Sequence, residues 1–294
     1  MTKPIMRARL DAPLARVRHA LTDAEELSVW FAEHAEVELP ATYTFWGRYT
    51  PEGAEPHQRL LHADDTTLRF TWALDGIDTV VEITLAEETA DTTLITVSQS
   101  DIPSWEEMVA EANVRAVLYT FWALAIANLS DHLMGRSLNP LCDFTSAEMR
   151  ARVVIAATPA EVFAALTTPA SFGQWFGANI EIEPWVGGRF AMGGFDIDAQ
   201  PATITEFEQD HKLTMSWEDT GATSWELDGS EGATRLTIVH SGFDTANPPY
   251  GGWMGWLSGV AELRRFVELS EWRSIWLEVS LDGIPEGMLT IDHS

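Results

Sequence analysis

The stretches "ALTDAEELSVWF" (Ala20–Phe31) and "ALTTPASFGQWF" (Ala165–Phe176) decide the expected fold of this chain. Both begin with Ala-Leu-Thr, end with Trp-Phe and have seven residues between these ends. The second stretch begins 145 residues after the first, which is about half of the 294 residues. Because this length is typical of two domains of ~150 residues each, the repeat indicates the duplication of a whole domain.

Further segments repeat in the same order. The segment "TLRFTW" (Thr67–Trp72) matches "KLTMSW" (Lys212–Trp217), and both alternate in the manner of strands. A long helical pattern closes each half, at residues 104–134 and 251–269. Each half therefore predicts a strand, two short helices, an antiparallel meander and a long helix. Since a sheet curled around one helix buries its apolar face, we predict an α+β fold with two such domains.

The expected domain boundaries follow from the repeat. We place the first domain at residues 1–135, a linker at 136–147, the second domain at 148–270 and a C-terminal extension at 271–294. The linker follows Gly135 and contains Asn-Pro and Ser, which favour an irregular connection. The extension has no counterpart in the first half, and we expect it to pack back onto the domains. On a helix its Trp272 and Trp276 would share a face.

Composition excludes several classes of function. The chain has 45 acidic and 18 basic residues and a formal net charge of −27, which argues against binding to nucleic acid or to an anionic membrane. Its apolar stretches are shorter than a membrane span, and its start lacks the apolar core of a signal peptide, so we expect a cytoplasmic protein. One cysteine and scattered histidines give no metal-binding pattern. We expect no metal and no cofactor.

Three more motifs stand in the second half: "EPWVGGRF" (183–190), "TRLTIVHSGF" (234–243) and "GWMGWLSGVAEL" (252–263). Together with the Trp-Phe stretch, they resemble the SRPBCC or START-like superfamily, and within it the bacterial branch similar to the activator of heat-shock-protein-90 ATPase. The resemblance implies a tandem of helix-grip domains, each a curved antiparallel sheet wrapped around a long C-terminal helix. Members bind hydrophobic small molecules, act as polyketide cyclases or serve as co-chaperones. The first half is more divergent.

We predict an aromatic pocket between the sheet and the C-terminal helix of the second domain. Its candidate ligand-binding residues are Trp175, Phe176, Phe190, Met192, Phe195, Trp217, Trp225, His240, Trp253 and Trp256. The alternative interpretation is that these aromatic side chains fill the core. For Trp175 and Phe176 we favour that alternative, because both halves keep the pair. For Trp225 and Trp253 we favour the pocket, because their aligned partners in the first half include an ordinary Ile83.

His240 is the best polar candidate. It has the strand parity of Leu236 and Ile238 and should point inward, where it could bind a ligand or act as an acid or base. A structural role at a strand end is the favoured interpretation, and its counterpart in the first half is Ser98. Three carboxylates are expected nearest to the predicted pocket: Asp196, Asp198 and Glu206. Asp196 and Asp198 have strand spacing, and paired carboxylates can do acid–base work. A chance pair on a solvated face is the favoured interpretation.

The leading hypothesis is non-catalytic binding of a hydrophobic or aromatic small molecule, chiefly in the second domain. The first domain would then be mainly structural or regulatory, and the fusion would hold together two domains that otherwise pair as a homodimer. One alternative is a protein partner, as for a chaperone-ATPase activator. A further alternative is a cyclase-like enzyme that uses His240. No motif demands catalysis, and no catalytic residue is assigned.

Overall fold

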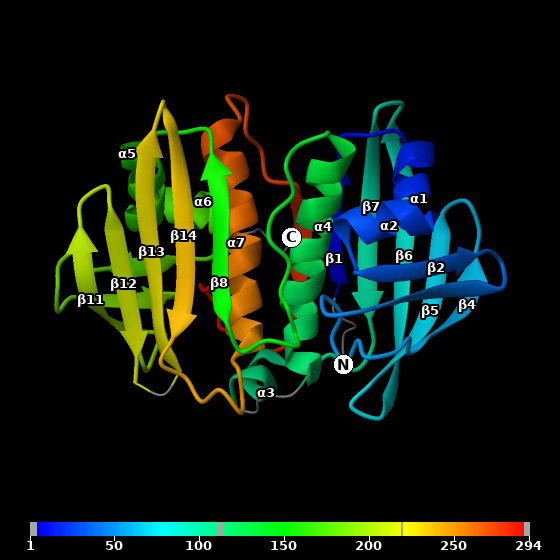
Figure 1. Ribbon diagram of the computed structural model, residues 1–294, viewed down its shortest axis with the longest axis horizontal. Helices are drawn as coiled ribbons and strands as arrows, with labels where there is room; N and C mark the ends of the chain where they lie inside the picture. The colour runs from blue at the N-terminus through cyan, green and yellow to red at the C-terminus, as the bar shows by residue number, and fades with distance from the viewer. Residues whose placement is uncertain (1–4, 111–113, 219, 291–294) are drawn as a thin grey trace.

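The computed structural model describes residues 5–110, 114–218 and 220–290 (Figure 1). Two curved antiparallel sheets stand on either side of a central pair of helices, α4 (Leu118–Leu133) and α7 (Tyr250–Glu268), which pack against each other. Each of these two helices closes one half of the chain. The prediction of an α+β fold with two tandem helix-grip domains is therefore confirmed.

The first domain carries a six-stranded sheet in the order β15-β1-β7-β6-β5-β4, and β2 and β3 form a separate ribbon. Its remaining helices precede the sheet's meander or lead into α4. The elements are β1 (Ile5–Leu10), α1 (Leu14–Thr22), α2 (Ala24–Trp30), β2 (His34–Glu38), β3 (Thr42–Trp46), β4 (Gln58–Ala63), β5 (Thr67–Leu74), β6 (Ile77–Thr89), β7 (Thr92–Gln99), α3 (Trp105–Ala110) and the 3₁₀ turn η1 (Val114–Val117).

The second domain carries a seven-stranded sheet in the order β8-β14-β13-β12-β11-β10-β9. Two short helices again follow the first strand. The elements before α7 are β8 (Met149–Ile155), α5 (Pro159–Thr167), α6 (Pro169–Phe176), β9 (Ile180–Ile182), β10 (Arg189–Met192), β11 (Ala202–Glu208), β12 (Lys212–Trp217), β13 (Gly221–Ser230) and β14 (Ala233–Ser241).

The repeated stretch forms the same corner in both domains. The indole N–H of Trp30 donates to the carbonyl of Ala20 at 3.1 Å, and that of Trp175 donates to the carbonyl of Ala165 at 3.0 Å. In each case a tryptophan in the last turn of the second short helix bonds to the first residue of the motif. A buried indole needs one acceptor, and the corner supplies it within the motif. The sequence repeats because this corner recurs.

One predicted helix is wrong in its extent. The pattern at residues 104–134 is not one helix, because the chain forms α3, then η1, and only then the long α4 from Leu118. The break brings α3 to the base of the central helix pair. In the second half the helix α7 covers the predicted residues 251–269 to within one residue at either end.

The C-terminal extension joins the two domains. Its strand β15 (Trp276–Ser280) pairs with β1 of the first domain, with Met6 opposite Val279. The expected helical face of Trp272 and Trp276 is therefore wrong, since Trp276 begins a strand. The chain then returns to the second domain, where Asn179 N–H donates to the Met288 carbonyl at 2.8 Å. The extension thus runs from one sheet to the other.

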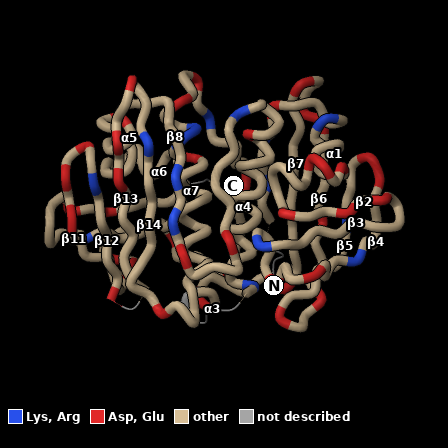
Figure 2. The backbone as a smooth tube through the Cα atoms, in the orientation of Figure 1, with Lys and Arg blue, Asp and Glu red and all other residues tan. Residues whose placement is uncertain are grey.

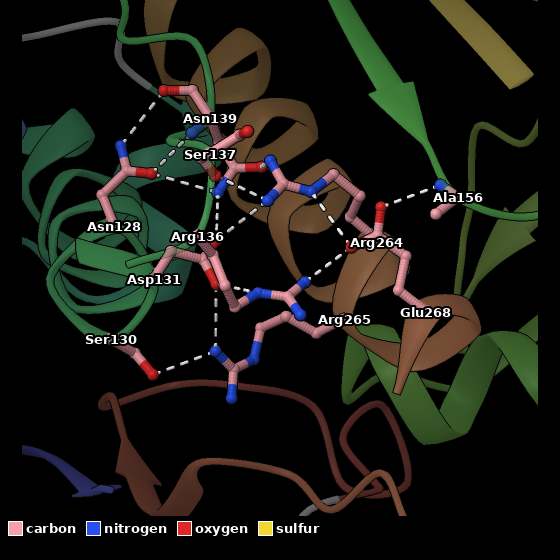
Figure 3. A network of polar contacts seen from close by, with 10 residues as sticks. All are labelled: Asn128, Ser130, Asp131, Arg136, Ser137, Asn139, Ala156, Arg264, Arg265 and Glu268. Atoms are coloured by element: carbon pink, nitrogen blue, oxygen red, sulfur yellow. Dashed lines mark hydrogen bonds and ion pairs between the residues drawn. The ribbon is translucent and has the colours of Figure 1, made fainter. Parts of the chain in front are cut away.

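A buried charge network joins α4 to α7 (Figure 3). The Asp131 carboxylate on α4 is fully buried and accepts from Arg136 at 3.0 Å and from Arg265 of α7 at 3.3 Å. Arg264 of α7 lies 3.6 Å from its other oxygen, and Asn139 donates to that oxygen at 2.9 Å. Two arginines of the second domain therefore neutralise a carboxylate of the first.

Most charged residues of the molecule are acidic. Acidic residues are spread over the outer loops and strands of both domains, and basic residues are few (Figure 2). No helix within the described residues is long and apolar enough to cross a membrane.

Candidate functional site

A cavity of about 580 Å³ lies where the two domains and the C-terminal extension meet. This volume is within the roughly 300–1,000 Å³ of small-molecule sites. The first domain contributes residues of β1, α3, η1 and α4: Met6, Trp105, Met108, Ala116, Tyr119, Thr120 and Ala123. The extension contributes Trp276, Val279, Ile284, Met288 and Leu289. The second domain supplies the remainder, so three parts of the chain enclose the space.

Six of the ten candidate residues line this cavity: Trp175, Phe176, Met192, Trp217, His240 and Trp256. The other four do not. Phe190, Trp225 and Trp253 are buried in the core, and Trp225 meets Trp256 edge to face at 5.4 Å. Phe195 instead lies under the guanidinium of Arg189, 4.0 Å from its ring centre.

The site differs in position from the expected one. Sequence reasoning considered only a pocket between the sheet and helix of the second domain, and it named no residue of the first domain or the extension. These were missed because they come to the site through the pairing of α4 with α7 and of β15 with β1.

Glycines of α7 form one wall of the cavity. Gly252, Gly255 and Gly259 all line it, as does Gly251. A Cβ atom on Gly259 would lie only 2.7 Å from Phe176 Cε2, so the absence of a side chain lets α6 approach. Gly252 is exposed, and a Cβ atom on it would meet nothing within 4 Å, so a longer side chain has room there.

The ring of His240 is held by the protein on both sides. Its Nε2 lies 2.8 Å from the Thr220 carbonyl, which can only accept, so Nε2 donates. Its Nδ1 therefore accepts from the Thr223 hydroxyl, also at 2.8 Å. Burial lowers the pKa of His240, which keeps the ring neutral, although the Thr220 carbonyl opposes this. This arrangement matches the structural role favoured above.

The three carboxylates considered above lie away from the cavity. Asp196 is in a turn after β10, so the strand spacing assumed for Asp196 and Asp198 is wrong. Glu206 on β11 forms an ion pair with Lys212 at 3.0 Å and accepts from Thr214. No group of three or more His, Cys, Asp or Glu side chains in the described part of the chain could hold a metal ion.

Glu262 of α7 is a polar lining residue that sequence reasoning missed. It is 5% exposed, and neither carboxyl oxygen has a hydrogen bond of ordinary geometry within the described residues. Burial raises its pKa to about 7; Arg265 opposes the rise, Asp131 adds to it, and the indole of Trp276 opposes it. At neutral pH this carboxyl group therefore exchanges readily between its charged and neutral forms.

The family is decided by a comparison with family models. The model described as Activator of Hsp90 ATPase homolog 1-like protein matches residues 11–129 and 156–267, more than half of the chain. The chain belongs to this family. The two matches fall on the two halves, as a tandem duplication requires. A search of curated proteins finds no match.

Solved structures with similarity to the chain include both single-domain and longer proteins. Protein CV1439 from Chromobacterium violaceum is 22% identical over 42% of this chain and 99% of its own, with a TM-score of 0.34. The Aha1 dimer from Colwellia psychrerythraea is 18% identical over 42% of this chain and 98% of its own, with a TM-score of 0.37. DynU16, a protein of the dynemicin biosynthetic locus, is 16% identical over 90% of this chain and 97% of its own, with a TM-score of 0.36.

Proposed function

We propose that this protein binds an apolar small molecule in the cavity between its two domains. The observation that carries the proposal is a space of about 580 Å³ whose lining is mostly aromatic, aliphatic and glycine residues. Apolar surface that leaves water supplies about 25 cal/mol per Å², so a flat apolar molecule gains affinity from such walls. The expected ligand is a hydrophobic or aromatic small molecule. Residues of the first domain and of the C-terminal extension line its site together with residues of the second domain.

The interior of the first domain supports a structural role for that domain. Aromatic rings fill the space between its sheet and α4. The ring centres of Phe45 and Trp72 are 5.1 Å apart, and those of Trp72 and Phe121 are 5.5 Å apart. In the same interior, the indole N–H of Trp122 on α4 donates to the side-chain oxygen of Gln99 on β7 at 2.7 Å. The hollow beside this cluster measures about 10 Å³, too little for an organic ligand. The first domain therefore acts as a wall of the shared cavity.

Filling the cavity from α7 tests the proposal. Isothermal titration with naphthylethanol, an uncharged aromatic compound, measures the affinity of the unaltered protein and of Gly252→Leu. Because the leucine side chain would occupy the space at Gly252, we expect a loss of affinity of at least about tenfold, or 1.4 kcal/mol. The control Gly252→Ala adds one methyl group and should bind nearly normally. Equal affinity for all three proteins, or no binding to any, would overturn the proposal.

A protein partner is the second candidate, and one surface feature favours it. Trp185 and Val186, at the tip of the loop between β9 and β10, are 55% and 63% exposed. Exposed large apolar side chains of this kind often mark contact sites. If the protein activates a chaperone ATPase, it should raise the ATPase rate of a purified Hsp90, and Trp185→Ala should weaken the effect. An unchanged ATPase rate would remove this candidate.

Cyclase-like catalysis by His240 has less support. Both ring nitrogens are engaged with Thr220 and Thr223, so a proton transfer would first have to break one of these contacts.

A further inference from the structure

We propose that the cavity selects a hydrophobic amine, whose ammonium group forms an ion pair with the carboxylate of Glu262. This inference rests on the proposed function, because it assigns the chemical class of the ligand in that same cavity. The inference adds one polar group of the ligand, the ammonium group, and the residue that recognises it, Glu262.

The charges that line the cavity favour a cation. Among the described residues that form its walls, Glu262 is the one acidic side chain, and neither lysine nor arginine contributes. The neutral ring of His240 adds no charge. Outside the cavity, a net charge of −27 attracts cations toward the protein. A carboxylic acid ligand would meet the Glu262 carboxylate with no cation to offset it.

Glu262 lies on the face of α7 that lines the cavity, and neighbouring side chains cover both oxygens of its carboxyl group. Gly255, Gly259 and Glu262 lie four and three residues apart, so they share one face of α7, the face that lines the cavity. Helix side chains tilt toward the N-terminus, so Glu262 leans over the turn that contains Gly259. Gly259 has no side chain, and the rings of Phe176 and Trp175 take the space beside it.

Aromatic rings surround this point on two sides. Phe176 and Trp175 reach the position of Gly259, where a Cβ atom would lie 2.7 Å and 3.4 Å from them. The indole of Trp276, from the extension, acts on Glu262 itself and lowers its pKa. An ammonium group beside a carboxylate and between aromatic faces gains both an ion pair and cation–π attraction. An uncharged alcohol gains neither in full.

The protein's own charges leave Glu262 without an ion pair. Arg265 on the next turn faces it, but its guanidinium is held by Asp131 at 3.3 Å and by the Ser130 hydroxyl at 2.9 Å. No arginine, lysine or histidine nitrogen of the described residues lies within 4.0 Å of the Glu262 oxygens. A buried carboxylate with no partner is destabilising, and a ligand cation would remove that penalty.

The test compares two probes that differ in one group. Naphthylethylamine carries an ammonium group where naphthylethanol carries a hydroxyl group, and both are titrated calorimetrically at pH 8 into the unaltered protein and into Glu262→Gln. Glutamine keeps the shape of the side chain and removes its charge. We expect the amine to bind the unaltered protein at least about tenfold more tightly than the alcohol, as hydrogen bonds to charged groups imply. Glu262→Gln should abolish this preference, so that it binds the two compounds with similar affinity.

Other results would contradict the inference in distinguishable ways. If the alcohol binds as tightly as the amine, or if Glu262→Gln keeps the preference, the amine assignment is overturned and the proposed function stands. If neither compound binds the unaltered protein, both are overturned. The amine's affinity should also fall as the pH is lowered from 8 to 5.5, because a protonated Glu262 cannot form the ion pair.

Discussion

At the residue scale, Glu262 shows how a site can reduce the stability of the protein that holds it. The groups that face its carboxyl are Arg265 on α7, Asp131 on α4 and Trp276 on β15. The first and last favour the charged form, the second disfavours it, and burial outweighs them all. The folded protein therefore holds this proton more tightly than the unfolded chain does.

This difference predicts a pH-dependent stability. The pKa of Glu262 rises from 4.5 to about 7 on folding, so its stabilising contribution is complete below pH 4.5 and is lost as the pH rises through 7. At about 1.4 kcal/mol per pKa unit, the loss is about 3 kcal/mol. Urea unfolding of the unaltered protein and of Glu262→Gln at several pH values measures it. The difference between the two proteins should shift by this amount from pH 4.5 to 8; a constant difference would contradict the assignment.

A sequence pattern could not identify Glu262 as a lining residue. Within "GVAELRRF", a glutamate followed by two arginines is typical of the solvated face of an amphipathic helix. In the structure α7 packs against α4 of the other domain, and Glu262, Arg264 and Arg265 are all buried. His240 could be placed correctly, because strand parity depends only on neighbouring residues.

At the element scale, α7 combines two uses of glycine. At Gly259 the missing side chain allows contact with Phe176, whereas at Gly255 a Cβ atom would lie 3.8 Å from Thr120, an ordinary contact distance. Glycine destabilises a helix interior relative to alanine. At Gly259 the close contact with Phe176 offsets this destabilisation, whereas at Gly255 the missing side chain leaves room in the cavity.

The two glycines predict opposite effects of the same substitution. Gly255→Ala should raise the free energy of unfolding by about 0.5–1 kcal/mol, because the new methyl group fits and the helix gains propensity. Gly259→Ala should lower it by roughly 1–3 kcal/mol, because the methyl group collides with Phe176. Urea unfolding measures both. A stabilising Gly259→Ala would show that α6 does not pack closely on α7.

The elements differ in how far the sequence could predict them. The Ala-Leu-Thr and Trp-Phe motif predicts its corner well, because the Trp30 and Trp175 hydrogen bonds close within each motif. The strand β15 could not be predicted, because its partner β1 lies at the opposite end of the chain. The segment at 104–134 was predicted as one helix, although the described residues form α3, the 3₁₀ turn η1 and α4 as separate elements.

At the scale of the whole molecule, the two domains are joined through a buried ion pair and a shared strand. Asp131 offers one carboxylate to arginines of both the linker and α7. The extension adds β15 to the first sheet and then reaches the segment between α6 and β9 of the second domain. The duplicated domains therefore form one unit, and the cavity exists only where they meet.

The buried pair predicts a large loss of stability when one partner is removed. Asp131→Asn should lower the free energy of unfolding by about 3–5 kcal/mol, because the buried Arg265 loses its carboxylate partner and Arg264 keeps only the longer contact with Glu268, at 3.7 Å. The control is Asp11→Asn, since the Asp11–Arg273 pair at 2.7 Å is exposed and should contribute about 0–1 kcal/mol. Equal effects of the two substitutions would mean that Asp131 does not hold the domains together.

The central claim is that one ligand touches both domains and the extension at once, and methionine methyl NMR tests it most directly. Met6 and Met108 of the first domain, Met192 of the second and Met288 of the extension all line the cavity, whereas Met149 and Met215 are buried elsewhere. In protein labelled with ¹³C at the methionine methyl groups, saturating naphthylethylamine should shift the four lining signals together and leave the other two in place. Shifts confined to one domain, or no shifts, would contradict the claim.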